Sequence, residues 1–245
     1  MRALERLIAI LEAVADSPGP ATAAATADRV GLSPSTISRM MRDLAEYGLL
    51  QRLEPNGSYV LGTRLVEIVR SALRPTDLVE AAMPVMKELR NSIGETVALH
   101  VRRMNTRICV AQVQSLQPVR RVVPVGFTVP LHYGATGEVL LGGMPTAELD
   151  EYLGTLGLSG PERRSLMDRL TLLNERGWLA ATDSWAKGLA GIAAPVRVAG
   201  RTVASLSVSG PSNRLDEATI EATGPLVAAA SARIGANLTE DDVHL

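Results

Sequence analysis

Hydroxyl and arginine side chains recur with helical spacing between residues 33 and 46, and they are the groups in this chain best suited to chemistry with a partner. Residues three or four apart share one side of a helix, and this side carries Ser35, Arg39, Arg42 and Glu46. Hydroxyls and backbone amides in the first turn of a helix can bind phosphate. Arginines further along can reach phosphates or guanine edges. The pattern predicts contact with duplex DNA.

The other side of the same helix is apolar, because Ile37, Met41 and Leu44 recur there. This side is expected to pack against the rest of its domain. Ser33 followed by a proline is a strong helix start, and Gly48 is a usual residue after a helix end. We therefore expect one amphipathic helix with a buried side and an exposed, cationic side.

The predicted DNA-binding set combines this helix with one residue of the strand that follows it. Its members are Ser33, Ser35, Thr36, Ser38, Arg39, Arg42 and Arg52. An alternative stays open for the two helical arginines, which is that Arg39 and Arg42 are solvated and pair with Asp43 and Glu46 along the helix, as exposed arginines usually do.

Two helices are expected before this one and a hairpin after it. Apolar residues at helical spacing predict the first helix from Leu4 to Val14, and Thr22 can cap a second that runs to Val30. Short strands are expected at 49–53 and 58–61, on either side of Pro55-Asn56-Gly57, which is a strong turn signal. Three helices and a hairpin in this order predict a winged helix-turn-helix with the third helix as the reader.

The rest of the chain mixes helices and strands. A helix is expected from 63 to 73, then a break at Arg74-Pro75. Further helices are expected at 77–92 (kinked or restarted at Pro84), 134–141, 147–153, 162–176 and 217–238 (broken at Gly224-Pro225), and strands at 97–101, 108–113, 119–125, 192–198 and 202–209. The fold class is a two-domain α/β protein. We predict a winged helix-turn-helix domain at 1–62, a linker helix at 63–75, and an effector-binding and oligomerisation domain at 76–245.

Composition limits the classes of function. The 245 residues are 46% hydrophobic and 21% charged, with a formal net charge of -1, so any DNA-binding charge must be local. Cys109 is the only cysteine, which excludes an intramolecular disulfide and a multi-cysteine zinc site. We find no catalytic, metal-binding or phosphate-loop motif and predict no catalytic residue, no metal and no cofactor. We also expect no signal peptide, no membrane partner and a cytoplasmic location.

Several segments together resemble the IclR family of bacterial regulators. They are Arg2 to Arg6, Arg29 to Arg39, Gly48-Leu49-Leu50, Tyr59 to Gly62, Pro130 to Gly137, Gly188 to Val196, and Ser205 to Pro211. These segments span nearly the whole chain in the same order as in the family. The resemblance implies a GAF-like α+β effector domain, which is an antiparallel sheet flanked by helices with a pocket on one sheet face.

Carried over by position, the resemblance implies a set of effector-binding residues. They are Val129, Ala135, Thr136, Asp183, Leu189, Gly191, Ser207 and Ser209. Apolar walls with a few hydroxyls and backbone amides suit a small molecule such as an organic acid, and these donors carry no formal positive charge. Gly191 stands where members of the family often have cysteine, and this departure leaves two alternatives open, a pocket reshaped for a different molecule or no pocket.

The expected function is a sequence-specific transcriptional regulator, a repressor rather than an activator, whose affinity for a double-stranded operator changes with the small-molecule effector. A homodimer or a dimer of dimers is expected, because helix-turn-helix proteins bind paired half-sites. Two other classes stay open: a small-molecule enzyme built on the C-terminal domain, and a nucleic-acid-binding protein without a ligand. Ser207 and Ser209 could also lie on a solvent-facing edge, and His132 could simply hold a turn.

Overall fold

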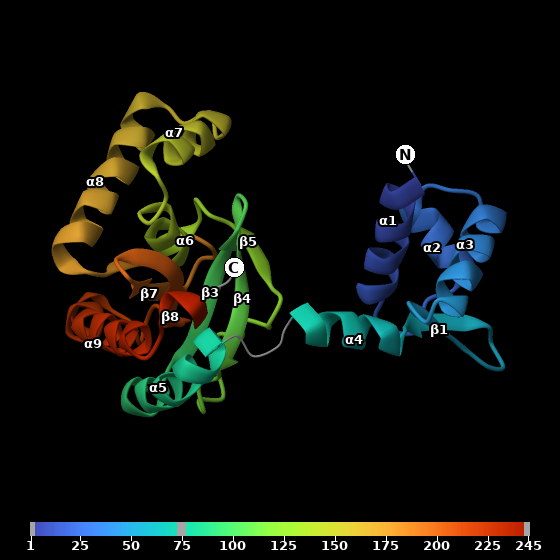
Figure 1. Cartoon of the computed structure of the whole chain (residues 1–245), viewed down its shortest axis with the longest axis horizontal. Helices are drawn as coiled ribbons and strands as arrows, with labels where there is room; N and C mark the ends of the chain where they lie inside the picture. The colour runs from blue at the N-terminus through green and yellow to red at the C-terminus, as the bar shows by residue number, and fades with distance from the viewer. Residues whose placement is uncertain (1–2, 73–76, 243–245) are drawn as a thin grey trace. The chain divides into compact units, whose positions relative to one another are not determined.

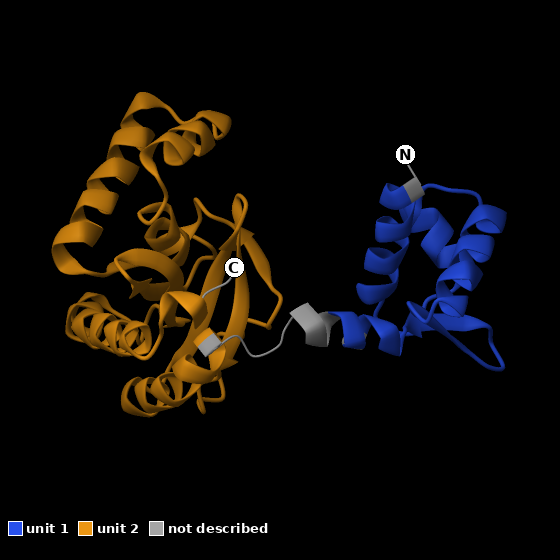
Figure 2. Cartoon of the chain, viewed as in Figure 1, with its two compact units in different colours: residues 1–74 blue, residues 75–245 orange. Residues whose placement is uncertain are grey.

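The computed structural model describes residues 3–72 and 77–242. The chain divides into residues 1–74, called unit 1 here, and residues 75–245, called unit 2 (Figure 2). Two predicted features, the helix end at Leu73 and the break at Arg74-Pro75, lie outside the described residues. The two units are treated separately below.

Unit 1 contains the predicted three helices and hairpin, followed by a fourth helix (Figure 1). The elements are α1 (Ala3–Ala15), α2 (Ala23–Val30), α3 (Pro34–Glu46), β1 (Leu50–Leu53), β2 (Ser58–Leu61) and α4 (Thr63–Ala72). The strands β1 and β2 pair antiparallel, with Leu50 opposite Leu61 and Leu53 opposite Ser58. This is a winged helix-turn-helix with β1 and β2 as the wing.

The core of unit 1 holds α3 against the other helices and the wing. Ile37, Met41 and Leu44 are buried, so the predicted apolar side of α3 is confirmed. The wing is fixed to the helices at two points. Backbone bonds of 2.8 Å join Ala21 and Tyr59 in both directions. At the base of the wing Gly62 lies so close to the Gly48 carbonyl that a Cβ would approach it to 2.1 Å, so only glycine fits there.

Unit 2 is a six-stranded antiparallel sheet with helices on both faces. The strands are β3 (Thr96–Arg103), β4 (Thr106–Val113), β5 (Thr128–Pro130), β6 (Leu179–Thr182), β7 (Leu189–Val198) and β8 (Arg201–Pro211), and their order is β5-β4-β3-β8-β7-β6. The helices are α5 (Asp77–Ile93), α6 (Gly134–Leu141), α7 (Thr146–Thr155), α8 (Gly160–Arg176), α9 (Glu217–Ala236) and the short 3₁₀ helix η1 (Glu240–Asp242). The predicted antiparallel sheet flanked by helices is confirmed.

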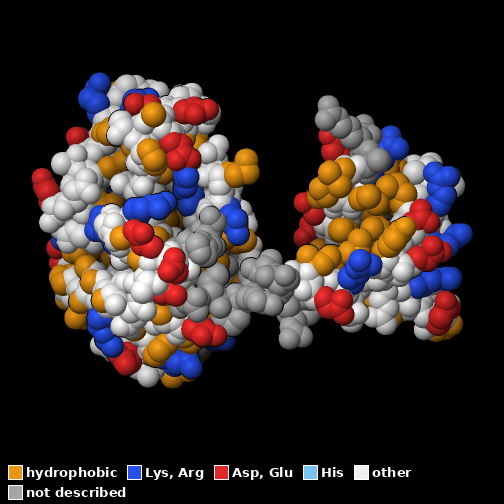
Figure 3. All heavy atoms as spheres, in the orientation of Figure 1, with side chains coloured by type: hydrophobic (Ala, Val, Ile, Leu, Met, Phe, Trp, Pro, Cys, Tyr) orange, Lys and Arg blue, Asp and Glu red, His pale blue; other side chains and the backbone are white. Residues whose placement is uncertain are grey.

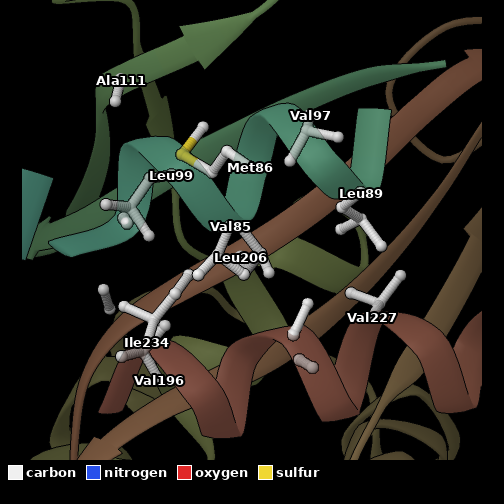
Figure 4. Close-up of a cluster of buried hydrophobic side chains, with 14 of the residues drawn as sticks. Val85, Met86, Leu89, Val97, Leu99, Ala111, Val196, Leu206, Val227 and Ile234 are labelled. Atoms are coloured by element: carbon white, nitrogen blue, oxygen red, sulfur yellow. The ribbon is translucent and has the colours of Figure 1, made fainter. Parts of the chain in front are cut away.

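One face of the sheet is sealed by α5 and α9, and Figure 4 shows their apolar side chains meeting those of the strands. Successive residues of a strand point to opposite faces. Val97 and Leu99 of β3 and Leu206 and Val208 of β8 therefore share this face, and none of the four is exposed to solvent. The other face is lined by smaller and polar residues and packs on α6.

Two sequence predictions are wrong, one of a strand and one of a break in a helix. Residues 119–125 do not form a strand. Polar side chains hold this segment instead, because Thr96 Oγ1 donates to the Arg121 carbonyl at 2.6 Å and Val123 N donates to Gln112 Oε1 at 2.6 Å. The expected break at Gly224-Pro225 is absent, since α9 continues through it with Gly224 packed on the Trp178 ring. Tertiary packing overrides the local signal at both places.

Smaller differences concern α5, β5 and β6. Helix α5 runs through Pro84 without restarting, and Ala82, Val85 and Met86 around the proline are buried in the core. Strands β5 and β6 have no counterpart among the predicted strands, because three and four residues are too few for a clear alternation. Within the described part of the chain, no helix is both long and apolar enough to cross a membrane.

The buried face of β8 provides a test of this core. Leu206→Ala should lower the free energy of unfolding of unit 2 by about 2–5 kcal/mol, because it removes a fully buried side chain and leaves a cavity. Urea unfolding followed by circular dichroism measures the change. The control is Leu116→Ala, since Leu116 is 82% exposed, and it should stay within about 0.5 kcal/mol of the parent. Equal effects of the two substitutions would contradict the assigned core.

Candidate nucleic-acid interface and ligand cavity

The start of α3 is organised by Ser33. Its hydroxyl accepts from Thr36 N at 3.3 Å and lies 2.8 Å from Thr36 Oγ1 and 3.2 Å from Ser35 Oγ. Ser33 is therefore the N-cap of the helix. Ser35 is exposed, and Thr36 and Ser38 are half-buried. The result is a helix N-terminus that presents hydroxyls, which is favourable for a phosphate. Pro34 has no N–H, and the Thr36 amide is already bonded to Ser33, so the hydroxyls supply most of the donors.

Arg39 and Arg42 lie on the exposed side of α3. Among residues 3–72 and 77–242 neither guanidinium has a hydrogen bond or an ion pair, so the pairs with Asp43 and Glu46 that the sequence allowed are not formed. Arginine side chains are visible along the side of unit 1 where α3 lies (Figure 3). Both arginines are available to phosphates or base edges.

Arg52 lies on β1, close to the turn of the wing. Its guanidinium forms one ion pair, with Glu54 at 3.6 Å, and both side chains are more than half exposed. An exposed pair of this kind contributes about 0–1 kcal/mol. Arg52 therefore remains free to exchange Glu54 for the backbone of a nucleic acid.

A cavity of about 80 Å³ opens on the polar face of the unit 2 sheet, beside the start of α6. It brings together seven of the eight residues that the resemblance indicated. These are Val129, Ala135, Thr136, Leu189, Gly191, Ser207 and Ser209. They come from β5, α6, β7 and β8, so only the folded sheet assembles them.

Asp183 is the eighth residue, and it is not among those that line the cavity. Its backbone has φ 58°, and its carboxylate accepts from Gly188 N at 2.6 Å. Asp183 thus closes the loop between β6 and β7. That loop places Ser184 and Trp185 at the cavity instead.

The main residues that sequence reasoning missed are charged or titratable: His100, Arg107 and Arg121 also line the cavity. The sequence indicated only uncharged donors, and the structure adds two arginines to the same wall. A signal was present for one of them, because Arg107 alternates in phase with Cys109 along β4 and both are buried. Nothing local could indicate Arg121, which reaches the cavity from an irregular segment.

Arg107 is held in an unusual state for a cation. It is 8% exposed, and one of its terminal nitrogens donates to the Tyr133 carbonyl. Its Nε is buried and has no partner within the described residues. Burial, followed by the charge of Arg121, lowers the pKa of Arg107 to about 10. Arg107 therefore remains charged near neutral pH.

His100 lies beside these cations and is neutral. It is 5% exposed, and burial lowers its pKa to about 3, with further lowering by Arg107 and Arg121. Its Nδ1 has no hydrogen-bond partner among the described residues. A neutral imidazole offers one donor and one acceptor, so His100 adds hydrogen-bonding capacity to the cavity but no charge.

The serines and aromatic rings complete the walls. Ser207 is buried on β8, an interior strand between β3 and β7, and its hydroxyl donates to the Ala98 carbonyl at 3.3 Å. The solvent-facing edge that the sequence allowed for this serine is therefore excluded. Trp185 meets the Phe127 ring edge-on, with centroids 6.1 Å apart. His132, in contrast, bonds Tyr152 Oη at 2.9 Å and is not part of the cavity lining.

Fold and site together define a class of protein: a winged helix-turn-helix DNA-binding unit joined in one chain to an antiparallel α/β unit with a small cavity. Comparison with known families agrees. Residues 3–54 match the IclR helix-turn-helix domain, and residues 70–236 match the C-terminal domain of the bacterial transcriptional regulator IclR. The chain belongs to the IclR family and is a DNA-binding transcriptional regulator.

Individual relatives are similar over nearly their whole length. The transcriptional regulator BhcR of Paracoccus denitrificans is 27% identical over 234 residues, which cover 93% of this chain and 84% of the relative. The transcriptional repressor AllR of Escherichia coli K12 is 29% identical over 233 residues, 92% of this chain and 86% of the relative. An IclR homologue from Microbacterium hydrocarbonoxydans, solved in complex with 4-hydroxybenzoate, is 26% identical with a TM-score of 0.79, covering 96% and 98% of the two chains.

The state of His100 gives a pH prediction. Its pKa is lowered from 6.5 in the unfolded chain to about 3 in the folded protein, so below pH 6.5 the unfolded chain binds a proton that the folded protein does not. Stability is thus lost as the pH falls from 6.5 towards 3. Between pH 7 and pH 5 the loss due to His100 should be about 2 kcal/mol. Urea unfolding of the parent and of His100→Gln measures it, and an unchanged pH slope in the variant would contradict the assignment.

Proposed function

We propose that this regulator represses transcription from an operator that it binds as a homodimer or a dimer of dimers, and that a small organic acid in the unit 2 cavity changes its affinity for DNA. The observation that carries the DNA-binding part is the pair of unengaged guanidiniums of Arg39 and Arg42 on the recognition helix. Repression is the activity in the name of AllR. A dimer accounts for recognition of paired half-sites.

The contacts to DNA divide into two kinds. The start of α3, with Ser33, Ser35, Thr36 and Ser38, faces the phosphate backbone and sets the position of the helix, as Arg52 does from the wing. Arg39 and Arg42 project further along the helix, where a recognition helix meets base edges in the major groove. Specificity should therefore depend on the two arginines more than on the hydroxyls.

The effector part of the proposal rests on the cavity. It joins apolar walls to a few convergent polar groups, which is the usual make-up of a small-molecule site. The relative from Microbacterium hydrocarbonoxydans holds an organic acid, 4-hydroxybenzoate. We assign residues 1–62 to DNA binding, 63–75 to the link between the functions, and 76–245 to effector binding and oligomerisation. An effector can shift DNA affinity only by binding two conformations of the protein unequally.

Substitution of the recognition helix tests DNA binding. Arg39→Ala or Arg42→Ala should weaken binding to the operator duplex by about 1–3 kcal/mol for a residue that contacts a base, and should relax discrimination at that base pair. If the replaced arginine contacts only phosphate, the substitution should weaken binding to all duplexes by the same factor. Fluorescence anisotropy with the operator and a scrambled duplex separates these cases.

The matched control for this test is Arg103→Ala. Arg103 is an exposed arginine of unit 2, so the substitution removes the same charge outside the proposed interface. Its effect on operator affinity should be negligible. Unchanged affinity in both Arg39→Ala and Arg42→Ala would show that α3 is not the recognition helix.

Gly191 tests the effector site. A Cβ there would lie 3.6 Å from the nearest atom, the Val208 carbonyl, so alanine fits and leucine would fill the cavity. Gly191→Leu should abolish binding of an organic acid found by thermal-shift screening, whereas Gly191→Ala should retain it. A bound ligand at a hundred times its Kd adds about 2.7 kcal/mol of stability. Operator binding by the ligand-free variants should be unchanged. A Gly191→Leu protein that still binds the acid would place the site elsewhere.

A further inference from the structure

The side chain of Arg107 indicates what kind of ligand the cavity takes. We infer that Arg107 is a ligand-binding residue whose guanidinium binds the carboxylate of an organic anion, with Arg121 as a second cation beside it. This inference rests on the proposed function in one respect, that the cavity is the effector site. It goes further by naming the ionised carboxylate as the group that is sensed and the arginines that sense it.

The hydrogen bonds of Arg107 are incomplete without a ligand. A guanidinium has five N–H donors in a planar fork, and the structure records one bond for Arg107, to the Tyr133 carbonyl. Its Nε is buried without a partner in the described part of the chain. Buried donors are normally satisfied, because an unsatisfied one loses its hydration without compensation. Because Arg107 lies on the cavity wall, its unused N–H donors can form hydrogen bonds with a ligand in the cavity.

The charge of Arg107 is also unbalanced. The acidic side chain with an electrostatic effect on it is Glu138. That carboxylate is engaged elsewhere, with two nitrogens of Arg169 at 2.6 and 2.7 Å. Within the described residues Arg107 has no ion pair, and no aspartate or glutamate lines the cavity. A buried cation without a counter-ion is unfavourable, and a bound anion would supply the missing charge.

Arg121 increases this imbalance rather than relieving it. Thr96 fixes its backbone through the bond to the Arg121 carbonyl, and its guanidinium lies 5.9 Å from the centre of the Phe127 ring. It acts on Arg107 as a like charge. His100 is neutral, so the two arginines are the formal charges on the described cavity wall. Two cations and no acid in about 80 Å³ favour a compact anion.

A carboxylate fits this wall better than an inorganic anion does. Its two oxygens match the planar fork of a guanidinium. Much of the remaining wall is apolar, including Val129, Ala135 and Leu189, and can contact carbon atoms. A fully hydrated sulfate or phosphate would leave these surfaces unused. The ligand is therefore expected to be an organic acid with its carboxylate towards Arg107 and its carbon skeleton against the apolar residues.

The test compares acids with their uncharged amides on the full-length protein. The probes are lactate and lactamide, 4-hydroxybenzoate and 4-hydroxybenzamide, and malonate, with sulfate and phosphate as inorganic anions. At a hundredfold excess over its Kd, a binding acid should raise the thermal midpoint by about 5–10 °C, and its amide should have no effect. Overturning results are an amide that binds as well as its acid, an inorganic anion that binds best, or no stabilisation by any acid at millimolar concentration.

Substitutions then test Arg107 itself. Arg107→Met should weaken binding of the stabilising acid by about tenfold to a hundredfold, the usual range for losing a hydrogen bond to a charged group. Arg107→Lys should bind with intermediate affinity, because it keeps the charge and loses the planar fork. The control is Arg103→Met, an exposed arginine of the same unit, with unchanged affinity. Equal affinities for the parent and Arg107→Met would overturn the inference.

Stability without ligand separates binding from a structural role. Arg107→Met removes an unbalanced buried cation, so the ligand-free variant should melt at the same temperature as the parent or higher. A fall in the midpoint of several degrees, or failure to fold, would mean that Arg107 maintains the fold, and would overturn the inference. Release of the operator by an organic acid that the parent and Arg107→Met bind equally well would overturn it while leaving the proposed function intact. Binding of an acid by Arg107 with no effect on operator affinity would count against the proposed function alone.

Discussion

The alternation of side chains along β8 is the constraint on which the rest of unit 2 depends. Leu206 and Val208 point into the core sealed by α5 and α9, and this fixes Ser207 and Ser209 on the opposite face. A shift of one residue in the pairing with β3 would exchange the two sets and bury hydroxyls in the apolar core. Because one face supplies the stability, the other can keep a cavity with polar walls.

Two arginines on that side of the sheet differ in whether an acidic side chain balances their charge, and this difference distinguishes a structural role from ligand binding. Arg169 is paired with the largely buried Glu138 and also donates to the Ala180 carbonyl at 2.8 Å, so it ties α8 to α6 and β6. Arg107, which is more deeply buried, has no acidic partner in the described residues. A satisfied buried pair holds the structure in place, whereas an unsatisfied cation has free energy to gain from a ligand.

The arginines of unit 1 also divide into engaged and unengaged side chains. Arg29 is engaged with Asp16 at 2.7 Å, and Arg64 donates to the Tyr47 carbonyl at 3.1 Å, so both stabilise local structure. Arg39 and Arg42 make no such contact in the described part of the chain and remain open to DNA. The family and the role as a DNA-binding regulator therefore agree with the two unengaged arginines on α3.

The sequence by itself determined the elements of unit 1, because helix caps, glycine and a hairpin turn are local signals, and the apolar side of α3 has helical period. It also indicated seven lining residues of the cavity through resemblance. Only the tertiary structure decided the charge of that cavity. Arg107 and Arg121 come from different segments, and Arg121 lies where the sequence predicted a strand. Whether a cation is buried, and whether an acid balances it, depends on contacts between residues distant in the chain, and no local pattern encodes these contacts.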